Sequence, residues 1–387
     1  MSAAASPTPT ASISEPSRPP VGVGIIGLSA RGGWAARAHV PALEALSDKF
    51  ELRALSASSV ESAHAAGAKY GVPLAFGTAD DLVSRDEVDL VVVTVKVPHH
   101  RELVEAALRA GKNVLCEWPL ANGLTEAETL ADLATSAGVR AFTGLQARAN
   151  PALRYLRDLV AQGYVGEVLS TSMIASGATW GATYSPGGEY LLDRENGATM
   201  LTIPFGHTID VLSMVLGQFT EVTSTTAVRR PRVINPETGV SAAMTAADQV
   251  AVTGVLDSGA VAAVHYRGGT SRGTGFHWEI NGTEGDLVVT APSGHLQLAP
   301  VTLLGARGAA TVLTELTVPA AYEEVPALAG HSDQPSYAVA HAYAALFEDL
   351  VKGTHTVPDF PHAVRHHRFL DGVERAAATG RRIHTGR

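Results

Sequence analysis

The fold is decided by the stretch Val21-Gly22-Val23-Gly24-Ile25-Ile26-Gly27-Leu28-Ser29-Ala30-Arg31-Gly32-Gly33-Trp34. Its first six residues form a continuous apolar run, which predicts a buried strand. A glycine-rich turn follows, and a helical pattern begins at Trp34. A strand, a tight turn and a helix in this order direct free backbone N–H groups and the positive end of a helix at a phosphate.

The spacing of the glycines fits only part of the dinucleotide-binding pattern G-x-G-x-x-G. Gly27 and Gly32 take its first and third positions, whereas Ser29 stands at the second. The second glycine normally lets the backbone approach a pyrophosphate, so Ser29 is either tolerated there or donates its hydroxyl. A strand–helix turn without a ligand is the alternative.

Composition limits the class of protein. The 387 residues are enough for two domains with separate cores, and the 45% hydrophobic fraction is ordinary for a globular protein. A net charge of -9 argues against direct binding of nucleic acid, and no apolar run is long enough to cross a membrane. Because Cys116 is the only cysteine, no intrachain disulfide can form, so we expect a reducing, cytoplasmic location.

Residues 1–20 consist almost entirely of Ser, Pro, Ala and Thr, which predicts a disordered lead-in. From 21 to 145, strand patterns alternate with helix patterns, which predicts an α/β domain with a doubly wound parallel sheet of the Rossmann type. The expected strands are 21–26, 51–56, 74–76, 89–95, 113–116 and 139–144, and the expected helices are 33–46 with a break at Pro41, 60–70, 99–110 and 125–137.

Residues 146–387 predict a second domain, of α+β class, with a large, open, mainly antiparallel sheet. Few helices follow its strands, so one face stays uncovered; we expect that face to join copies of the chain into a homodimer or homotetramer. The expected strands are 167–176, 221–228, 249–256, 261–266, 276–281 and 286–290, the expected helices are 151–162, 199–216, 337–352 and 362–379, and 300–335 gives no clear pattern.

The order of these elements and a set of motifs resemble the glucose–fructose oxidoreductase / inositol dehydrogenase / MocA family. Its members pair an N-terminal Rossmann domain with a C-terminal domain built on an open sheet. The resemblance implies a nicotinamide dinucleotide cofactor and a small-molecule substrate. The motifs that follow the glycine turn are His39-Val40-Pro41-Ala42-Leu43, His100 with Ala106-Ala107-Leu108-Arg109-Ala110-Gly111-Lys112-Asn113-Val114, Glu117-x-Pro119-Leu120-Ala121, Gly163-Tyr164-Val165-Gly166-Glu167-Val168, Gly206-His207-Thr208-Ile209-Asp210 and Gly282-Thr283-Glu284-Gly285-Asp286-Leu287.

Two departures concern the proton-handling site that the resemblance implies. Family enzymes carry a catalytic lysine where this chain has Trp118 and an aspartate where it has Ile203, so His207 alone remains. The branch of the fungal galactose-pathway repressor is similar in this combination and in Gly-Leu-x-Ala-x-x-Gly-Trp-Ala, Glu-Trp and Phe-Gly-His-Thr-Ile-Asp. That repressor binds a nicotinamide dinucleotide without being known for turnover.

The residues expected to bind the cofactor lie in the glycine turn and at the ends of later strands. Residues 55–59, at the end of the second strand, include no acidic residue for a ribose 2′-hydroxyl. Serines there can bind a 2′-phosphate, although no arginine stands beside them in the sequence. NADP or NAD is therefore expected, with NADP favoured. The cofactor-binding set is Gly27, Leu28, Ser29, Ala30, Arg31, Gly32, Gly33, Trp34, Ser56, Lys96, His100, Glu117, Trp118 and Gln146.

Oxidation of an alcohol needs a base for the hydroxyl proton, which makes His207 and Lys96 the catalytic candidates. Asp210 follows His207 by three residues on an expected helix, and this spacing allows a carboxylate to orient an imidazole. A structural, buried histidine is the alternative. Lys96 follows the strand 89–95 at the carboxyl edge of the sheet, where it either meets the cofactor or substrate or is an exposed loop lysine.

The indole of Trp118 cannot accept a proton, so it either packs in a closed pocket or faces the substrate. The substrate-binding set is Trp118, Arg148, Trp180 and Asp210. No metal site is predicted, because His362 and His366 have helical spacing but no evident third ligand.

Three hypotheses follow. The first is an NAD(P)-dependent oxidoreductase acting on a sugar, cyclitol or related polyhydroxylated molecule, with a rearranged catalytic site. The second is a non-enzymatic, NAD(P)-binding regulator or sensor. The third is a lyase or epimerase that uses its cofactor transiently. We favour the first hypothesis, because this chain keeps the glycine turn, His207 and the polar sheet edge of the family enzymes.

Overall fold

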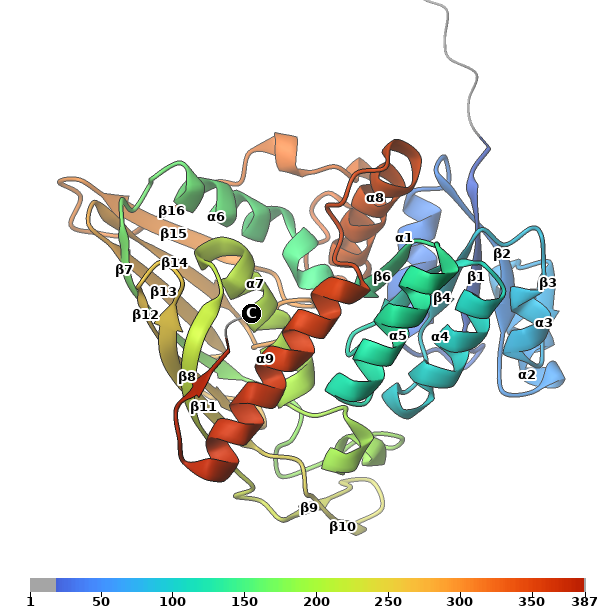
Figure 1. Cartoon of the computed structure of the whole chain (residues 1–387), viewed down its shortest axis with the longest axis horizontal. Coiled ribbons are helices and arrows are strands. Elements are labelled where there is room, and N and C mark those ends of the chain that lie inside the picture. Colours follow the sequence, from blue (N-terminus) through green and yellow to red (C-terminus); the bar gives the residue numbers. More distant parts are fainter. Residues whose placement is uncertain (1–18, 386–387) are drawn as a thin grey trace, which may run out of the picture.

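A six-stranded parallel sheet opens the computed structural model, which describes residues 19–385 (Figure 1). Its strand order, β3-β2-β1-β4-β5-β6, changes direction at β1 and β4, as doubly wound dinucleotide-binding folds do. The predicted Rossmann fold is confirmed, whereas the predicted lead-in lies almost wholly outside the described residues. The strands are β1 (Val21–Ile26), β2 (Phe50–Ser56), β3 (Leu74–Phe76), β4 (Leu90–Val93), β5 (Asn113–Glu117) and β6 (Ala141–Gly144).

Helices cover both faces of this sheet; they are α1 (Val40–Ala45), α2 (Val60–Tyr70), α3 (Ala79–Val83), α4 (His100–Arg109) and α5 (Leu124–Ala137). The first two share a core with one face, and the other three share a core with the opposite face. A turn of π-helix, Ala35–His39, precedes α1. Pro41 has no N–H to donate, so regular α-helical bonding cannot run through this point, where the sequence predicts a break.

The second sheet has nine strands in the order β16-β15-β14-β13-β7-β12-β11-β8-β17. Within the described chain, β7 and β12 pair in parallel and the other neighbours pair antiparallel, so the predicted mainly antiparallel sheet is confirmed. Its strands are β7 (Val168–Ser176), β8 (Phe219–Ala227), β11 (Gln249–Leu256), β12 (Val261–Arg267), β13 (Phe276–Gly282), β14 (Gly285–Ala291), β15 (Thr302–Arg307), β16 (Thr314–Glu315) and β17 (Ile383–His384). A separate hairpin pairs β9 (Arg232–Ile234) with β10 (Ser241–Ala243).

One face of the nine-stranded sheet packs against α6 (Pro151–Ala161), α7 (Gly206–Leu216) and α9 (Phe360–Thr379), and Figure 1 shows these helices between the two sheets. The opposite face is open. Ile174 lies there between His265 of β12 and His277 of β13, and it is 46% exposed, as Val261 is at 58%. The alternation along each strand therefore separates an apolar inner face from an outer face of small, polar and a few apolar side chains.

The helix α8 (Ser336–Lys352) returns to the first sheet, although it follows the strands of the second. Its residues Val339, Tyr343 and Leu346 belong to the core that contains β1 and α1. The core of the Rossmann sheet is thus completed by residues from near the other end of the chain. Figure 1 shows α8 beside α1 and β6.

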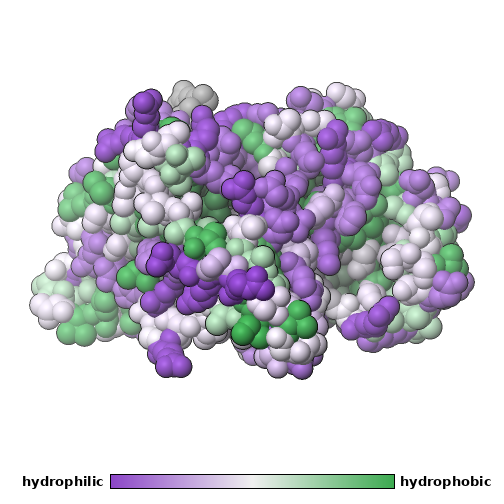
Figure 2. Space-filling view, turned by 90° about the horizontal axis from the view of Figure 1, so that it is seen from below, coloured by the Kyte–Doolittle hydropathy of each residue, from purple (hydrophilic) through white to green (hydrophobic). Residues whose placement is uncertain are grey.

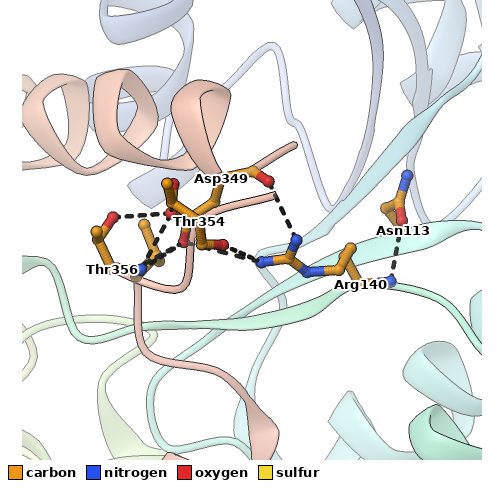
Figure 3. A network of polar contacts seen from close by, with 6 residues as sticks. Asn113, Arg140, Asp349, Thr354 and Thr356 are labelled. Atoms are coloured by element: carbon orange, nitrogen blue, oxygen red, sulfur yellow. Dashed lines mark hydrogen bonds and ion pairs between the residues drawn. The ribbon is translucent and has the colours of Figure 1, made fainter. Parts of the chain in front are cut away.

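A buried carboxylate fastens the end of α8 (Figure 3). Asp349 accepts hydrogen bonds from Thr354 Oγ1 at 2.6 Å, Val357 N at 2.9 Å and Thr356 N at 3.0 Å. Arg140, just before β6, donates to the carbonyl oxygens of Asp349 and Thr354. Burial alone would raise the pKa of Asp349, but these hydrogen bonds outweigh it and lower that pKa below its usual value.

No helix within residues 19–385 has the length and apolar character that crossing a membrane requires. On the face seen from below, hydrophilic side chains are distributed over the surface, and hydrophobic side chains form small groups between them (Figure 2).

The Asp349 carboxylate should stabilise the fold in a pH-dependent way. Its pKa is lower in the folded chain than the unfolded value of about 3.9, so its contribution is present above that pH and is lost as the pH falls through the folded pKa. We expect Asp349→Asn to lower the free energy of unfolding by about 1–3 kcal/mol at neutral pH, with the difference from the unmodified chain shrinking in acid. Urea unfolding from neutral pH downward measures this, with the more exposed Asp371→Asn as control. A pH-independent difference would contradict the assignment.

Candidate functional site

The glycine turn after β1 has the backbone that the sequence pattern requires. Gly27, Gly32 and Gly33 have φ of 102°, 101° and 117°, a region that side-chain-bearing residues rarely adopt. A Cβ at Gly27 would lie 2.8 Å from Val95 Cγ1, whereas one at Gly32 or Gly33 would meet nothing within 4 Å. Gly27 thus permits close packing against Val95, just after β4. Gly32 and Gly33 leave an open, concave stretch of backbone.

Contacts from α2 hold this turn in place. Lys69 Nζ donates to Ala30 O at 2.7 Å, and Tyr70 Oη donates to Ser29 O at 3.1 Å. Ser29 Oγ accepts from Arg31 N at 3.2 Å. The serine at the second pattern position therefore stabilises the turn with its oxygen, and its hydroxyl hydrogen remains able to donate to a ligand.

A groove of about 370 Å³ lies along the turn and the ends of β1, β2 and β3. Gly27, Leu28 and Ser29 line it, and Arg31 lines it together with Ser56, Ser58 and Ser62. The described residues of its lining include no carboxylate. Arg31 belongs to the expected cofactor-binding set, but sequence reasoning missed that it lines the groove with the serines, because they lie far from it along the chain.

Glu117 and Gln146, at the ends of β5 and β6, line a different and larger cavity of about 750 Å³, as Arg148 does. Glu117 Oε1 is 3.1 Å from His39 Nε2, and His39 Nδ1 is 2.9 Å from Tyr343 Oη. This chain of contacts joins β5, the turn of π-helix before α1, and α8. The structure therefore places some of the expected cofactor-binding residues at the groove, Glu117 and Gln146 at the larger cavity, and others at neither, and the roles of all of them remain predictions.

Trp118 is a packing residue in this structure. It is 5% exposed, its Nε1 donates to Thr202 O at 2.6 Å, and its ring lies 4.8 Å and 4.6 Å from the rings of His366 and His367. A Cβ at Gly206 would come within 2.9 Å of its Nε1. Trp118 was expected either to pack in a closed pocket or to face the substrate, and these contacts fit the first interpretation. Its indole fills the junction between α7 and α9.

His207, the first catalytic candidate, lies in the first turn of α7 and is 2% exposed. Its Nδ1 is buried and has no hydrogen-bond partner among residues 19–385. Burial lowers the pKa of His207 to about 3, against the opposing effect of Asp210. The imidazole is therefore neutral at physiological pH and has a nitrogen that no described residue uses.

Asp210 does not orient His207 as their spacing led us to expect. Its Oδ1 lies 2.6 Å from His362 Nε2 in α9 and 3.4 Å from Arg148 Nη1. The ring nitrogens of His362 also meet two arginines, Arg148 Nη1 at 3.2 Å from Nε2 and Arg365 Nη2 at 3.4 Å from Nδ1. Burial would raise the pKa of Asp210, but Arg148 and His362 hold it below its usual range.

The remaining candidates lie apart from His207 and Asp210. Lys96 is exposed, and its Nζ lies 4.6 Å from the ring centroid of Tyr190, so it reaches from the Rossmann sheet edge to the second domain. His100 is buried with its ring nitrogens against Pro119 O and Val95 O. Trp180 is buried at φ 59°, donates to Leu191 O and stacks on His295. None of these three residues lines either of the two cavities described above.

Sequence reasoning missed the contribution of the last helix. Burial lowers the pKa of His366 to about 4 and that of His367 to about 3, so both are neutral beside Trp118. The histidines of α9 were visible only as a local spacing, and their partners lie more than a hundred residues earlier. Within the described chain, no group of three or more His, Cys, Asp or Glu residues has the geometry to hold a metal ion.

Two family models match the chain. Residues 21–145 match a model described as an oxidoreductase family with an NAD-binding Rossmann fold, and residues 151–291 match one described as the C-terminal domain of Gal80p.

Curated relatives agree with the two family models. The galactose/lactose metabolism regulatory protein GAL80 of Saccharomyces cerevisiae is 30% identical over 309 residues, covering 74% of this chain and 71% of that protein. Dehydrogenase aclE of Aspergillus oryzae is 28% identical over 348 residues, covering 87% and 89%. The 1,5-anhydro-D-fructose reductase of Ensifer adhaerens is 30% identical over 259 residues, covering 67% and 74%. The chain belongs to the glucose–fructose oxidoreductase / inositol dehydrogenase / MocA family, near its Gal80 branch.

Solved structures share the fold. A super-repressor mutant of Gal80p from Saccharomyces cerevisiae matches with a TM-score of 0.85 at 24% identity, covering 95% of this chain and 98% of that one. Levoglucosan dehydrogenase in complex with NADH and L-sorbose matches with a TM-score of 0.79 at 21% identity, covering 95% and 99%.

The ion pair between Arg148 and Asp210 should be essential to stability. Asp210 is 1% exposed, so Arg148→Met would leave a buried charge with less compensation, at a cost of about 3–5 kcal/mol. Arg154→Met removes a partly exposed pair with Glu324 and should cost about 0–1 kcal/mol. Thermal unfolding of the two variants measures the difference. Equal midpoints would show that Asp210 does not depend on Arg148.

Proposed function

We propose that this chain is an NAD(P)-dependent oxidoreductase that acts on a sugar, cyclitol or related polyhydroxylated small molecule through an atypical proton-handling site. Support comes from the family, from a curated dehydrogenase and a curated sugar reductase among its relatives, and from the glycine turn. The lone and buried Cys116 supports a reducing compartment such as the cytoplasm.

The groove at the glycine turn fits a dinucleotide. The open backbone at Gly32 and Gly33 suits a pyrophosphate, and Ser56, Ser58 and Arg31 surround the position expected for the adenosine ribose. When bound, the nicotinamide ring supplies the acceptor or donor of hydride. The chain itself has to bind the hydroxylated substrate and move the hydroxyl proton.

The observation that carries the proposal is the unpartnered Nδ1 of His207. A neutral imidazole can accept a proton, whereas the side chains at 118 and 203, Trp and Ile, cannot. His207 is the proposed acceptor of the substrate proton at an imidazole nitrogen, where the Asp210 carboxylate nearby offsets only part of the cost that burial puts on the charged form. Lys96, at the edge of the sheet, is the second candidate for this role.

Replacing His207 tests this proposal. We expect His207→Ala to lower the oxidation rate about a hundredfold to ten-thousandfold, because a positioned base is lost, while the affinity for NADH stays nearly unchanged. The measurement is NAD(P)H absorbance with a panel of sugars and polyols. His331→Ala, at an exposed position away from the groove and the open sheet face, is the control. Full activity in His207→Ala would overturn the site.

A specific observation favours a second function, that of a non-enzymatic NAD(P)-binding regulator. Trp118 stands where family enzymes carry the catalytic lysine, and here it is buried and hydrogen-bonded to Thr202 O. A relative, GAL80, is a regulatory protein. Tight cofactor binding without turnover across the whole substrate panel would favour this function over the first.

Cofactor preference is a further part of the proposal, and we favour NADP. Arg31 lines the groove with three serines and is positioned to bind a 2′-phosphate. Arg31→Ala should weaken NADPH binding about tenfold or more, the cost of a charge-assisted hydrogen bond, and change NADH binding much less. Quenching of the four tryptophans reports both titrations, with the exposed Arg37→Ala as control. Equal losses for the two cofactors would contradict the preference.

We also propose that the open face of the nine-stranded sheet joins two copies of the chain. Small and polar side chains alternate there with the exposed Ile174 and Val261, and a second sheet packs well on such a surface. Light scattering at micromolar concentration should give at least the mass of a dimer. Ile174→Lys, which places like charges face to face, should shift it toward the monomer. A monomeric unmodified chain would contradict this proposal.

A further inference from the structure

The cavity of about 750 Å³ lies under α8, where its lining comes from that helix, from α6 and from the edge strand β6. It has no lining residue in common with the groove at the glycine turn. A molecule bound there would leave the turn free for a dinucleotide. The volume is that of a typical small-molecule site.

Two side chains that line this cavity carry a buried oxygen with no hydrogen-bond partner among residues 19–385. The oxygens are Thr143 Oγ1 and Gln146 Oε1, on side chains that are 1% and 4% exposed. Buried polar atoms in folded proteins are nearly always hydrogen-bonded. An amide oxygen accepts hydrogen bonds and a hydroxyl can do so as well, so these atoms suit a ligand with hydroxyl donors.

Five basic side chains and three carboxylates line the cavity, so its lining is net positive, and four of the five basic groups also pair with a carboxylate. Three carboxylates line it, and each is already engaged: Glu324 with Arg154 at 2.7 Å, Glu117 with His39 at 3.1 Å, and Glu348 with Lys352. Asp158 and Asp210, which pair with Arg157 and Arg148, do not line the cavity. The basic side chains of the lining are Lys49, Arg148, Arg154, Arg157 and Lys352.

We propose that this cavity is a second small-molecule site, which takes a hydroxylated anion such as a sugar acid or a sugar phosphate. Lys49 and the N–H donors of the arginines that their ion pairs leave unused bind its anionic group, and the oxygens of Thr143 and Gln146 accept from its hydroxyl groups. This site goes beyond the function proposed above, because it requires neither turnover nor the groove at the turn. His39, at the end of the helical turn that follows the glycine turn, lines this site.

Calorimetric titration of the full chain, saturated with NADH, tests the proposal. The probes are D-gluconate, D-glucose 6-phosphate and neutral D-glucose. We expect at least one of the two anions to bind with one site per chain and at least tenfold more tightly than glucose, since a charge-assisted hydrogen bond is worth that factor or more. The tighter anion identifies a carboxylate or a phosphate as the natural group. Failure of both anions to bind, or binding that NADH displaces, would overturn the proposal.

Two variants place the probe in the cavity. Ala342, on α8, lines the cavity and is partly exposed, so Ala342→Trp should fill the space and weaken anion binding about tenfold or more. Ala378→Trp, on an exposed turn of α9, is the matched control and should leave anion binding unchanged. Arg157→Ala should weaken the anions and leave glucose unaffected. Near-equal NADH affinity in all variants shows that they fold, and anion binding that survives Ala342→Trp would overturn the site.

Discussion

The junction between the two domains depends on one buried carboxylate, that of Asp210. It lies on α7 and meets Arg148, in the segment that leaves the Rossmann sheet, and His362, in the last helix. Desolvating a carboxylate costs several kcal/mol unless charged and hydrogen-bonding partners surround it. The charge therefore selects the arrangement in which these three parts of the chain meet. The apolar core, which runs from the Rossmann sheet into the second domain, packs around that arrangement.

Neutral imidazoles and one indole fill the space beside this carboxylate. His207, His366 and His367 are buried and uncharged, and Trp118 packs on the last two. The packing that closes the junction thus uses the same side chains that would have to handle a proton. A protein of this design gains a rigid junction and keeps few groups that can act as bases, which is why an enzyme and a cofactor-binding regulator both fit the site.

Much of the fold follows from local patterns. The bounds of β1, α2 and β3 agree with the sequence because a strand of apolar residues, an N-cap at Ser59 and a glycine after Tyr70 are all local signals. The short α3 lacks a helical repeat long enough to detect, and β15 lies in a stretch rich in Pro, Gly and Ala. The contacts of the site do not follow from local patterns. The sequence near Asp210 does not indicate that His362 is its neighbour, and the sequence near Arg31 does not indicate that Ser58 lies beside the same groove. Tertiary packing alone brings each pair together.

The position of α8 has a consequence for synthesis of the chain. Residues from Val325 to Leu346 complete one face of the first sheet, so this face stays uncovered while the second domain is being made. At the usual pace of translation, the interval between Gly144 and Ser336 lasts on the order of ten to forty seconds. During this interval the emerging Rossmann strands expose apolar side chains to the ribosome's surroundings. The N-terminal domain can therefore complete its core only after nearly the whole polypeptide has been made.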